Sequence, residues 1–112
     1  MQVLGRILDV DLTNKRWCFS PFPEDLIWKF LGGRGFNVWY LFHHLSSTVN
    51  PLGPENILIF SDGVLTGTAA PAASRMNINA ISPQTGLLGS SNVGGDFGAE
   101  LRSCKIQTLI IR

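Results

Sequence analysis

The sequence contains few of the residues on which most catalytic and metal sites depend. Its 112 residues include only two cysteines and two histidines. Cys18 and Cys104 lie far apart and fit no zinc-ligand spacing, so we expect two separate thiols, with a disulfide as the alternative. His43 and His44 would diverge by about 100° on a helix, which argues against a shared metal. The sequence has neither a GxSxG nucleophile motif nor an evident pair of carboxylates for acid–base work. These shortages leave no recognisable catalytic machinery.

Charge and long apolar runs are also scarce. Only 15% of the residues are charged and the net charge is +1, so no broad field attracts nucleic acid or a membrane surface. No apolar run approaches the roughly 20 residues that span a bilayer, and Arg6, Asp9 and Asp11 interrupt any signal peptide. We therefore expect a soluble cytoplasmic protein. The high hydrophobic content, 45%, indicates that more protein covers part of its surface.

Hydrophobic periodicity predicts an α+β fold, with short mixed or antiparallel β-sheets and two to three helices. The expected strands are residues 8–12 and 17–19, paired as a hairpin, then 57–60, 76–80, a short segment from 87, and 108–111. The expected helices are residues 23–31, 36–45 and 97–103. Pro23 suits a first helical position, the pair Gly32 and Gly33 suits a helix stop, and Asp96 suits an N-cap.

Two features suggest that the domain is incomplete. The helix at 36–45 carries apolar residues on two sides, including Trp39 and Tyr40, and therefore needs two packing partners. The chain also stops directly after "TLII", inside what reads as a core strand. We expect uncovered apolar surface and self-association of the isolated chain.

Glycine and a single cation dominate the chemistry that is present. "GGRG" (32–35) and "NVGG" (92–95) would let the main chain approach a ligand closely, although such pairs also serve as turns and helix stops. "GGRGFN" follows a helix, so it is no dinucleotide fingerprint. Arg75 opens the strand that carries Asn77 and Asn79, where it offers a bidentate donor; the alternative is a solvent-facing arginine. This chemistry favours binding of an anion such as phosphate.

Several segments together resemble one family. They are "GRILDVDLT", "LIWKFLGGRGFNVWYLF", "NPLGPENILIFSDGVLTGTAAPAASRMN", "SPQTGLLGSSNVGGDFGAEL" and the closing "TLIIR". In this order they resemble the N-terminal domain of the tungsten-containing aldehyde ferredoxin oxidoreductases. The resemblance runs through nearly all of residues 1–112, which would form the first, metallopterin-cradling half of that domain.

The resemblance implies a set of roles. The complete enzyme would oxidise an aldehyde with water to a carboxylate, using a tungsten (or molybdenum) bis-pyranopterin and passing electrons through a [4Fe-4S] cluster to ferredoxin. Arg75, Asn92, Gly94 and Gly95 would contact the cofactor. The backbone carbonyl of Asn92 would bind a magnesium ion that links the pterin phosphates. The cluster ligands are not in this chain, so we expect the chain alone to be inactive.

Other interpretations stay open beside this one. The chain is alternatively a non-catalytic fragment or assembly subunit that needs a separate partner chain. A further alternative is a stand-alone phosphate-ligand binder that uses the same binding site without metal. The partners are accordingly the remaining domains or a partner chain, ferredoxin in the complete enzyme, or further copies of this chain.

Overall fold

The structure is a computed structural model that describes residues 5–112. It contains strands β1 (Arg6–Asp11), β2 (Arg16–Pro21), β3 (Leu58–Asp62), β4 (Met76–Ile81), β5 (Leu88–Val93) and β6 (Ile106–Ile111). The helices are α1 (Glu24–Phe30), α2 (Gly33–His44) and α3 (Phe97–Ser103). The predicted α+β class is confirmed.

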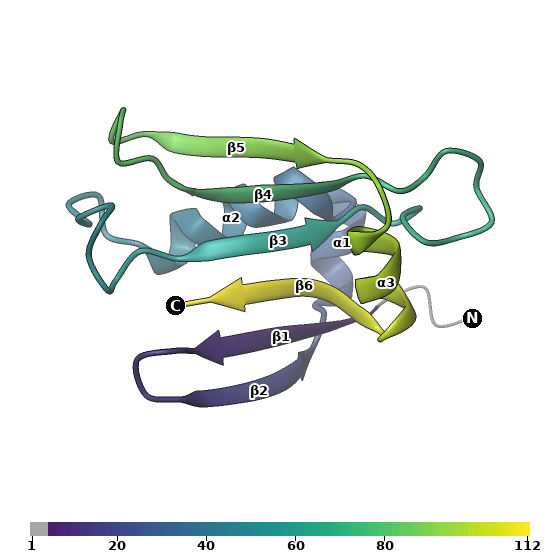
Figure 1. Cartoon of the computed structure of the whole chain (residues 1–112), viewed down its shortest axis with the longest axis horizontal. Coiled ribbons are helices and arrows are strands. Elements are labelled where there is room, and N and C mark those ends of the chain that lie inside the picture. Colours follow the sequence, from purple (N-terminus) through teal and green to yellow (C-terminus); the bar gives the residue numbers. More distant parts are fainter. Residues whose placement is uncertain (1–4) are drawn as a thin grey trace.

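All six strands form one sheet rather than several, in the order β2-β1-β6-β3-β4-β5. Neighbouring strands are antiparallel except for β1 and β6, which run parallel. In Figure 1, α1 and α2 lie behind the sheet, whereas α3 lies in front of it at one end. We call the side with α1 and α2 the helical face and the other side the open face. The two faces therefore differ in how much of them the chain itself covers.

The core lies between the sheet and helices α1 and α2, and it is built from apolar residues on the facing sides of these elements. Its members are Ile7, Phe22, Leu26, Ile27, Phe36, Leu41, Ile57, Ile59 and Ile110. Helix α2 is apolar on two sides as predicted, and the core covers the side that carries Trp39 and Tyr40 better than the side that carries Val38 and Phe42. Trp39 and Tyr40 pack against the core, while Val38 and Phe42 on the other side are exposed.

The junction between α1 and α2 corrects two predictions. Pro23 is the N-cap of α1 rather than its first helical residue. Leu31, and not a glycine, takes the left-handed C-cap conformation, with φ 57°. Gly32 instead caps α2, which begins at Gly33 and is three residues longer at its start than predicted. Gly32 is required there because a Cβ would lie 2.5 Å from the carbonyl oxygen of Asp62, and its φ is +73°.

Other predictions concern single residues. Asp96 occupies the N-cap position of α3 as predicted, but its side chain makes no capping hydrogen bond. Cys18 and Cys104 are free and exposed, so the two-thiol interpretation holds in this structure and the disulfide alternative does not. Among residues 5–112, no helix has the length and apolar character needed to cross a membrane.

Candidate functional site

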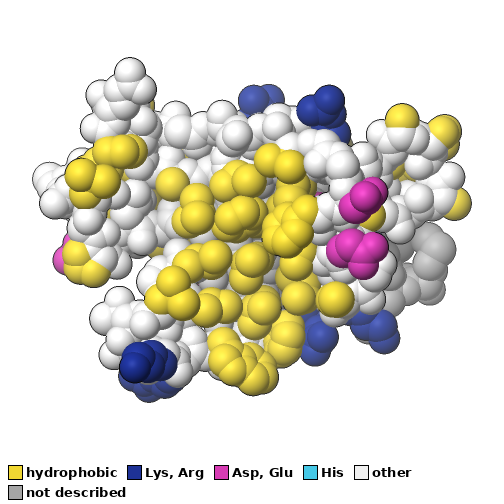
Figure 2. Space-filling model, viewed as in Figure 1, with side chains coloured by type: hydrophobic (Ala, Val, Ile, Leu, Met, Phe, Trp, Pro, Cys, Tyr) yellow, Lys and Arg dark blue, Asp and Glu magenta, His cyan; other side chains and the backbone are white. Residues whose placement is uncertain are grey.

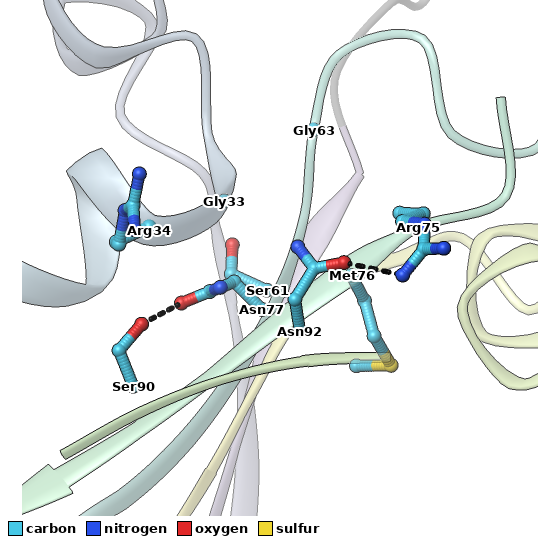
Figure 3. Close-up of a pocket in the computed structure, with 9 residues that line it drawn as sticks. All are labelled: Gly33, Arg34, Ser61, Gly63, Arg75, Met76, Asn77, Ser90 and Asn92. Carbon is cyan, nitrogen blue, oxygen red and sulfur yellow. Dashed lines mark hydrogen bonds between the residues drawn. The ribbon is translucent and has the colours of Figure 1, made fainter. Parts of the chain in front are cut away.

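A polar pocket of about 360 Å³ lies where the start of α2 meets one end of the sheet. At this end β3 and β5 finish and β4 begins. The pocket is lined by Gly33, Arg34, Ser61, Gly63, Arg75, Met76, Asn77, Ser90 and Asn92 (Figure 3). Four separate segments of the sequence therefore meet in one place: the start of α2, the end of β3, the start of β4 and the end of β5.

Arg75 and Asn92, both predicted site residues, are direct neighbours in the pocket. The guanidinium Nη1 of Arg75 donates a hydrogen bond to the Asn92 side-chain oxygen over 2.9 Å. Gly94 lies against the same arginine, since a Cβ on Gly94 would sit 3.7 Å from the Arg75 Cζ. Gly95 has a φ of +86°, and no atom comes within 4 Å of where its Cβ would be. The structure thus brings Arg75, Asn92 and Gly94 together and leaves Gly95 just beyond them, facing open space.

The backbone of Arg75 is held by the loop that connects β3 to β4. The buried Thr66 hydroxyl donates a hydrogen bond to the Arg75 carbonyl over 2.8 Å. The Gly67 N–H donates to the Ala73 carbonyl over 3.0 Å, which closes the loop on itself. Thr66 belongs to the "LTGT" motif, so this motif fixes the main chain from which the arginine projects.

Arg34 is a second pocket cation, which the sequence analysis did not assign. It lies in the first turn of α2, and Figure 3 shows it across the pocket from Arg75. The first turn of α2 contains no acidic residue, so the positive end of this helix is not neutralised there. The sequence analysis considers "GGRG" as backbone that a ligand could approach and as a helix stop, and neither prediction uses the arginine side chain. A β-bridge between Gly32 and Gly63 holds the start of α2 beside the end of β3, which places Arg34 at the pocket.

The floor of the pocket is made of amide side chains on the helical face of the sheet. Asn77, which is 6% exposed, accepts a hydrogen bond from Ser90 Oγ over 3.2 Å. Asn37 on α2 donates to the Asn79 side-chain oxygen over 2.9 Å and to the Asn77 carbonyl over 3.0 Å. These bonds tie α2 to β4 and hold the pocket walls at a fixed spacing.

Residues 5–112 contain no cluster of three or more histidine, cysteine or acidic side chains able to hold a metal ion. His43 and His44 bond through Nδ1 to the backbone carbonyls of Trp39 and Tyr40 respectively, each over 2.8 Å. The chemistry of the pocket is that of hydrogen-bond donors for an anion.

Comparison with known proteins points to one family. Residues 7–112 match the family model described as "Aldehyde ferredoxin oxidoreductase, N-terminal domain". The chain belongs to the aldehyde ferredoxin oxidoreductase family. The family resemblance drawn from the sequence is thereby confirmed.

Individual relatives agree with this assignment. The chain is 40% identical over 107 residues to the tungsten-containing aldehyde ferredoxin oxidoreductase of Thermococcus kodakarensis, covering 96% of this chain and 18% of that protein. It is 34% identical over 111 residues to an aliphatic sulfonate oxidoreductase, WOR-like subunit, of Pyrococcus furiosus, with the same coverage. A solved structure of the BamBC active-site complex of benzoyl coenzyme A reductase superimposes with a TM-score of 0.94 at 35% identity. That match covers 96% of this chain and 16% of the other, so this chain spans under a fifth of the length of these relatives.

Proposed function

We propose that this chain forms one wall of the metallopterin site in an enzyme of the aldehyde ferredoxin oxidoreductase family, and that it binds the phosphate of the cofactor. One observation carries the proposal: two arginines, Arg34 and Arg75, line the same pocket from opposite sides, and Asn92 holds one of them (Figure 3). Membership in a family whose relatives are named as tungsten-containing enzymes supports the choice of ligand.

The residues present fit a phosphate-bearing group. Two guanidinium groups offer charge-assisted donors, and the start of α2 adds backbone N–H groups at its positive end. Gly33 keeps the backbone bare at the pocket wall, and no carboxylate lines the pocket to repel an anion. When bound, the tungsten–pterin group supplies the two-electron redox chemistry, and the protein supplies binding and orientation.

Each residue would contribute a separate effect. Arg75 would neutralise phosphate charge, and its hydrogen bond to Asn92 would keep the guanidinium aimed at the pocket. Arg34 would approach the same anion from the other side. Asn92 lies on β5, the edge strand of the sheet, and we propose that its backbone carbonyl binds the magnesium ion of the cofactor. Gly94 and Gly95 would let the cofactor approach the main chain closely.

The activity of the complete enzyme is part of the same proposal. It would oxidise an aldehyde with water to a carboxylate and pass the electrons to ferredoxin through a [4Fe-4S] cluster held by other parts of the protein. This chain would contribute binding and orientation and no proton-transfer or nucleophilic group.

Titration of this chain with a pterin phosphate monoester tests the proposal, with amide chemical shifts and pterin fluorescence as readouts. We expect shifts at Asn92, Gly94 and Gly95, and binding about tenfold weaker in Arg75→Ala because one charge-assisted bond is lost. Arg16→Ala is the matched control, since Arg16 is an exposed arginine on β2 at the opposite edge of the sheet. Equal affinity for the pterin without its phosphate, or unchanged affinity in Arg75→Ala, would refute the phosphate role.

A further inference from the structure

Asp62 is a buried carboxyl that the phosphate proposal does not use, although it lies between two pocket residues. Ser61 and Gly63, its neighbours in the sequence, both line the pocket. Strand alternation turns the Asp62 side chain the other way, toward the open face, where it is 0% exposed. The carboxyl and a bound anion would therefore lie on opposite sides of one short stretch of backbone.

The surroundings of this carboxyl favour its uncharged form. Neither of its oxygens has a hydrogen-bond partner. Gly98 of α3 packs directly on it, since a Cβ on Gly98 would lie 2.6 Å from Asp62 Oδ1. Beside it, the ring of Phe97 on α3 packs edge to face with Phe60 on β3, and Figure 2 shows hydrophobic side chains across the adjoining sheet. Burial without hydrogen bonds raises the pKa of Asp62 to about 7.

The elements packed around the carboxyl bring one charge close to it. The Arg102 guanidinium on α3 opposes the rise of its pKa. The acidic residues beside it in the sequence, Asp96 and Glu100, are exposed to solvent. On β6, the neutral side chain of Gln107 accepts a hydrogen bond from Arg102 and donates one to the backbone carbonyl of the buried aspartate. On β4, the residue paired with the aspartate is the apolar Met76.

An anion in the pocket would lie close enough to this carboxyl to change its ionisation. Consecutive Cα atoms are about 3.8 Å apart, so an anion beside Ser61 and Gly63 lies on the order of 10 Å from the Asp62 carboxyl. Residues 63–74, which follow, contain no charged side chain that could offset the repulsion. Two unit charges at that separation, with an effective dielectric constant of about 20, change an equilibrium constant by about tenfold.

We propose that anion binding in the pocket is coupled to protonation of Asp62, so that the site holds its anion most tightly when this carboxyl is uncharged. The inference rests on the proposed phosphate function and adds a regulation of the same site. A bound anion repels only the ionised carboxyl, so binding should raise the pKa of Asp62 above about 7. By reciprocity, the affinity is highest below pH 7 and falls by about tenfold as the pH rises through 7 to above 8.

Titration of the chain with inorganic sulfate at a series of pH values tests the coupling. Sulfate keeps its charge between pH 5.5 and 8.5, whereas a phosphate monoester titrates near pH 6. Amide chemical shifts at Asn92 and Gly94 give the affinity at each pH, with sodium chloride holding the ionic strength constant. We expect the wild-type affinity to fall about tenfold more over this range than that of Asp62→Asn, whose side chain stays neutral.

Two controls belong to this experiment. The comparison with Asp62→Asn removes any pH effect of His43 and His44, because both chains contain them. Asp25→Asn removes an exposed carboxylate on α1 and should show the pH dependence of the wild type. Circular dichroism at each pH limits the comparison to the range in which all the chains are folded.

The reciprocal measurement needs no substitution. The carbon-13 chemical shift of the Asp62 carboxyl in the wild-type chain reports its titration directly. Saturating sulfate should move the midpoint of this titration upward from about pH 7 by roughly one pH unit, and sodium chloride at the same ionic strength should not.

The outcomes separate this inference from the proposed function. Sulfate binding that weakens in Arg75→Ala but has the same pH dependence in the wild type and in Asp62→Asn would overturn the coupling and leave the anion pocket in place. A titration midpoint of Asp62 that sulfate does not move would have the same meaning. Sulfate affinity that is unchanged in Arg75→Ala would overturn the pocket, and the coupling with it.

Discussion

Asp62 supports a prediction about stability and pH. It is the last residue of β3 and is 0% exposed, and neither of its carboxylate oxygens has a hydrogen-bond partner. Burial raises the pKa of Asp62 from 3.8 to about 7, and the Arg102 guanidinium on α3 opposes this shift only in part. The folded protein therefore holds this carboxyl in its protonated form at mildly acidic pH.

The sign of the effect follows from the two pKa values. The unfolded chain releases the proton near pH 3.8, whereas the folded chain keeps it until about pH 7. The stabilisation is complete below pH 3.8 and is lost as the pH rises through 7. A difference of about 3 pKa units corresponds to a loss on the order of 4 kcal/mol, a large share of the roughly 5–15 kcal/mol that stabilises a typical domain.

Asp62→Asn is the perturbation that isolates this group, because asparagine keeps the shape and stays neutral. Urea unfolding at a series of pH values between 4 and 8 should show the wild type losing stability as the pH rises. The asparagine variant should lose on the order of 4 kcal/mol less over the same range. Asp25→Asn, which removes a surface carboxylate instead, is the control and should leave the wild-type pH dependence in place. Parallel pH profiles for the wild type and Asp62→Asn would refute the reasoning.

Two further substitutions test neighbouring contacts. Gly98→Ala should destabilise the fold by about 2 kcal/mol in thermal or urea unfolding. The reason is that the added Cβ would lie 2.6 Å from Asp62 Oδ1 inside a packed region. A variant as stable as the wild type would show that α3 can shift away. Thr66→Val keeps the volume but removes the hydroxyl that holds the Arg75 carbonyl, so we expect about 1 kcal/mol of lost stability and weaker binding of the pterin phosphate. Binding that is unaffected while stability falls would show that Arg75 does not depend on this loop.

Much of the fold could be predicted from local patterns. Alternating residues and turn residues located the hairpin, and the turn between β1 and β2 is closed by Asn14, whose side chain and backbone both bond to Asp11. The helix junction could not be predicted in the same way. A Gly-Gly pair reads as a helix stop, but the need for Gly32 comes from the carbonyl of Asp62, which is thirty positions later. Only the packed structure reveals that contact.

In the candidate site, too, some residues could be predicted from local sequence and others could not. The sequence marks Arg75 because it is the lone cation of its segment, and the roles of Asn92 and Gly94 follow from the family resemblance. Arg34 and the hydroxyl of Thr66 were not assigned, because their roles depend on how the β3–β4 loop meets the start of α2. Local sequence can mark a residue that is chemically unusual. It does not show which distant segment completes the pocket.

Strand β4 shows why the two faces of this sheet have different uses. Its alternation of Asn77 and Asn79 with apolar residues predicts a strand with a polar face, and that face would ordinarily meet water. In this structure the polar face of β4 is the buried one, since Asn77 is 6% exposed and Asn79 1% exposed, and both lie beneath α2. Hydrogen bonds with Asn37 and Ser90 offset the cost of burying these amides, and Asn77 and Ser90 also line the anion pocket. The apolar partners Ile78 and Ala80 are thereby turned onto the open face. The polar pocket on the helical face and the apolar side chains on the open face thus follow from one strand orientation, which a swap of polarity between Ile78 and Asn79 would disrupt on both faces at once.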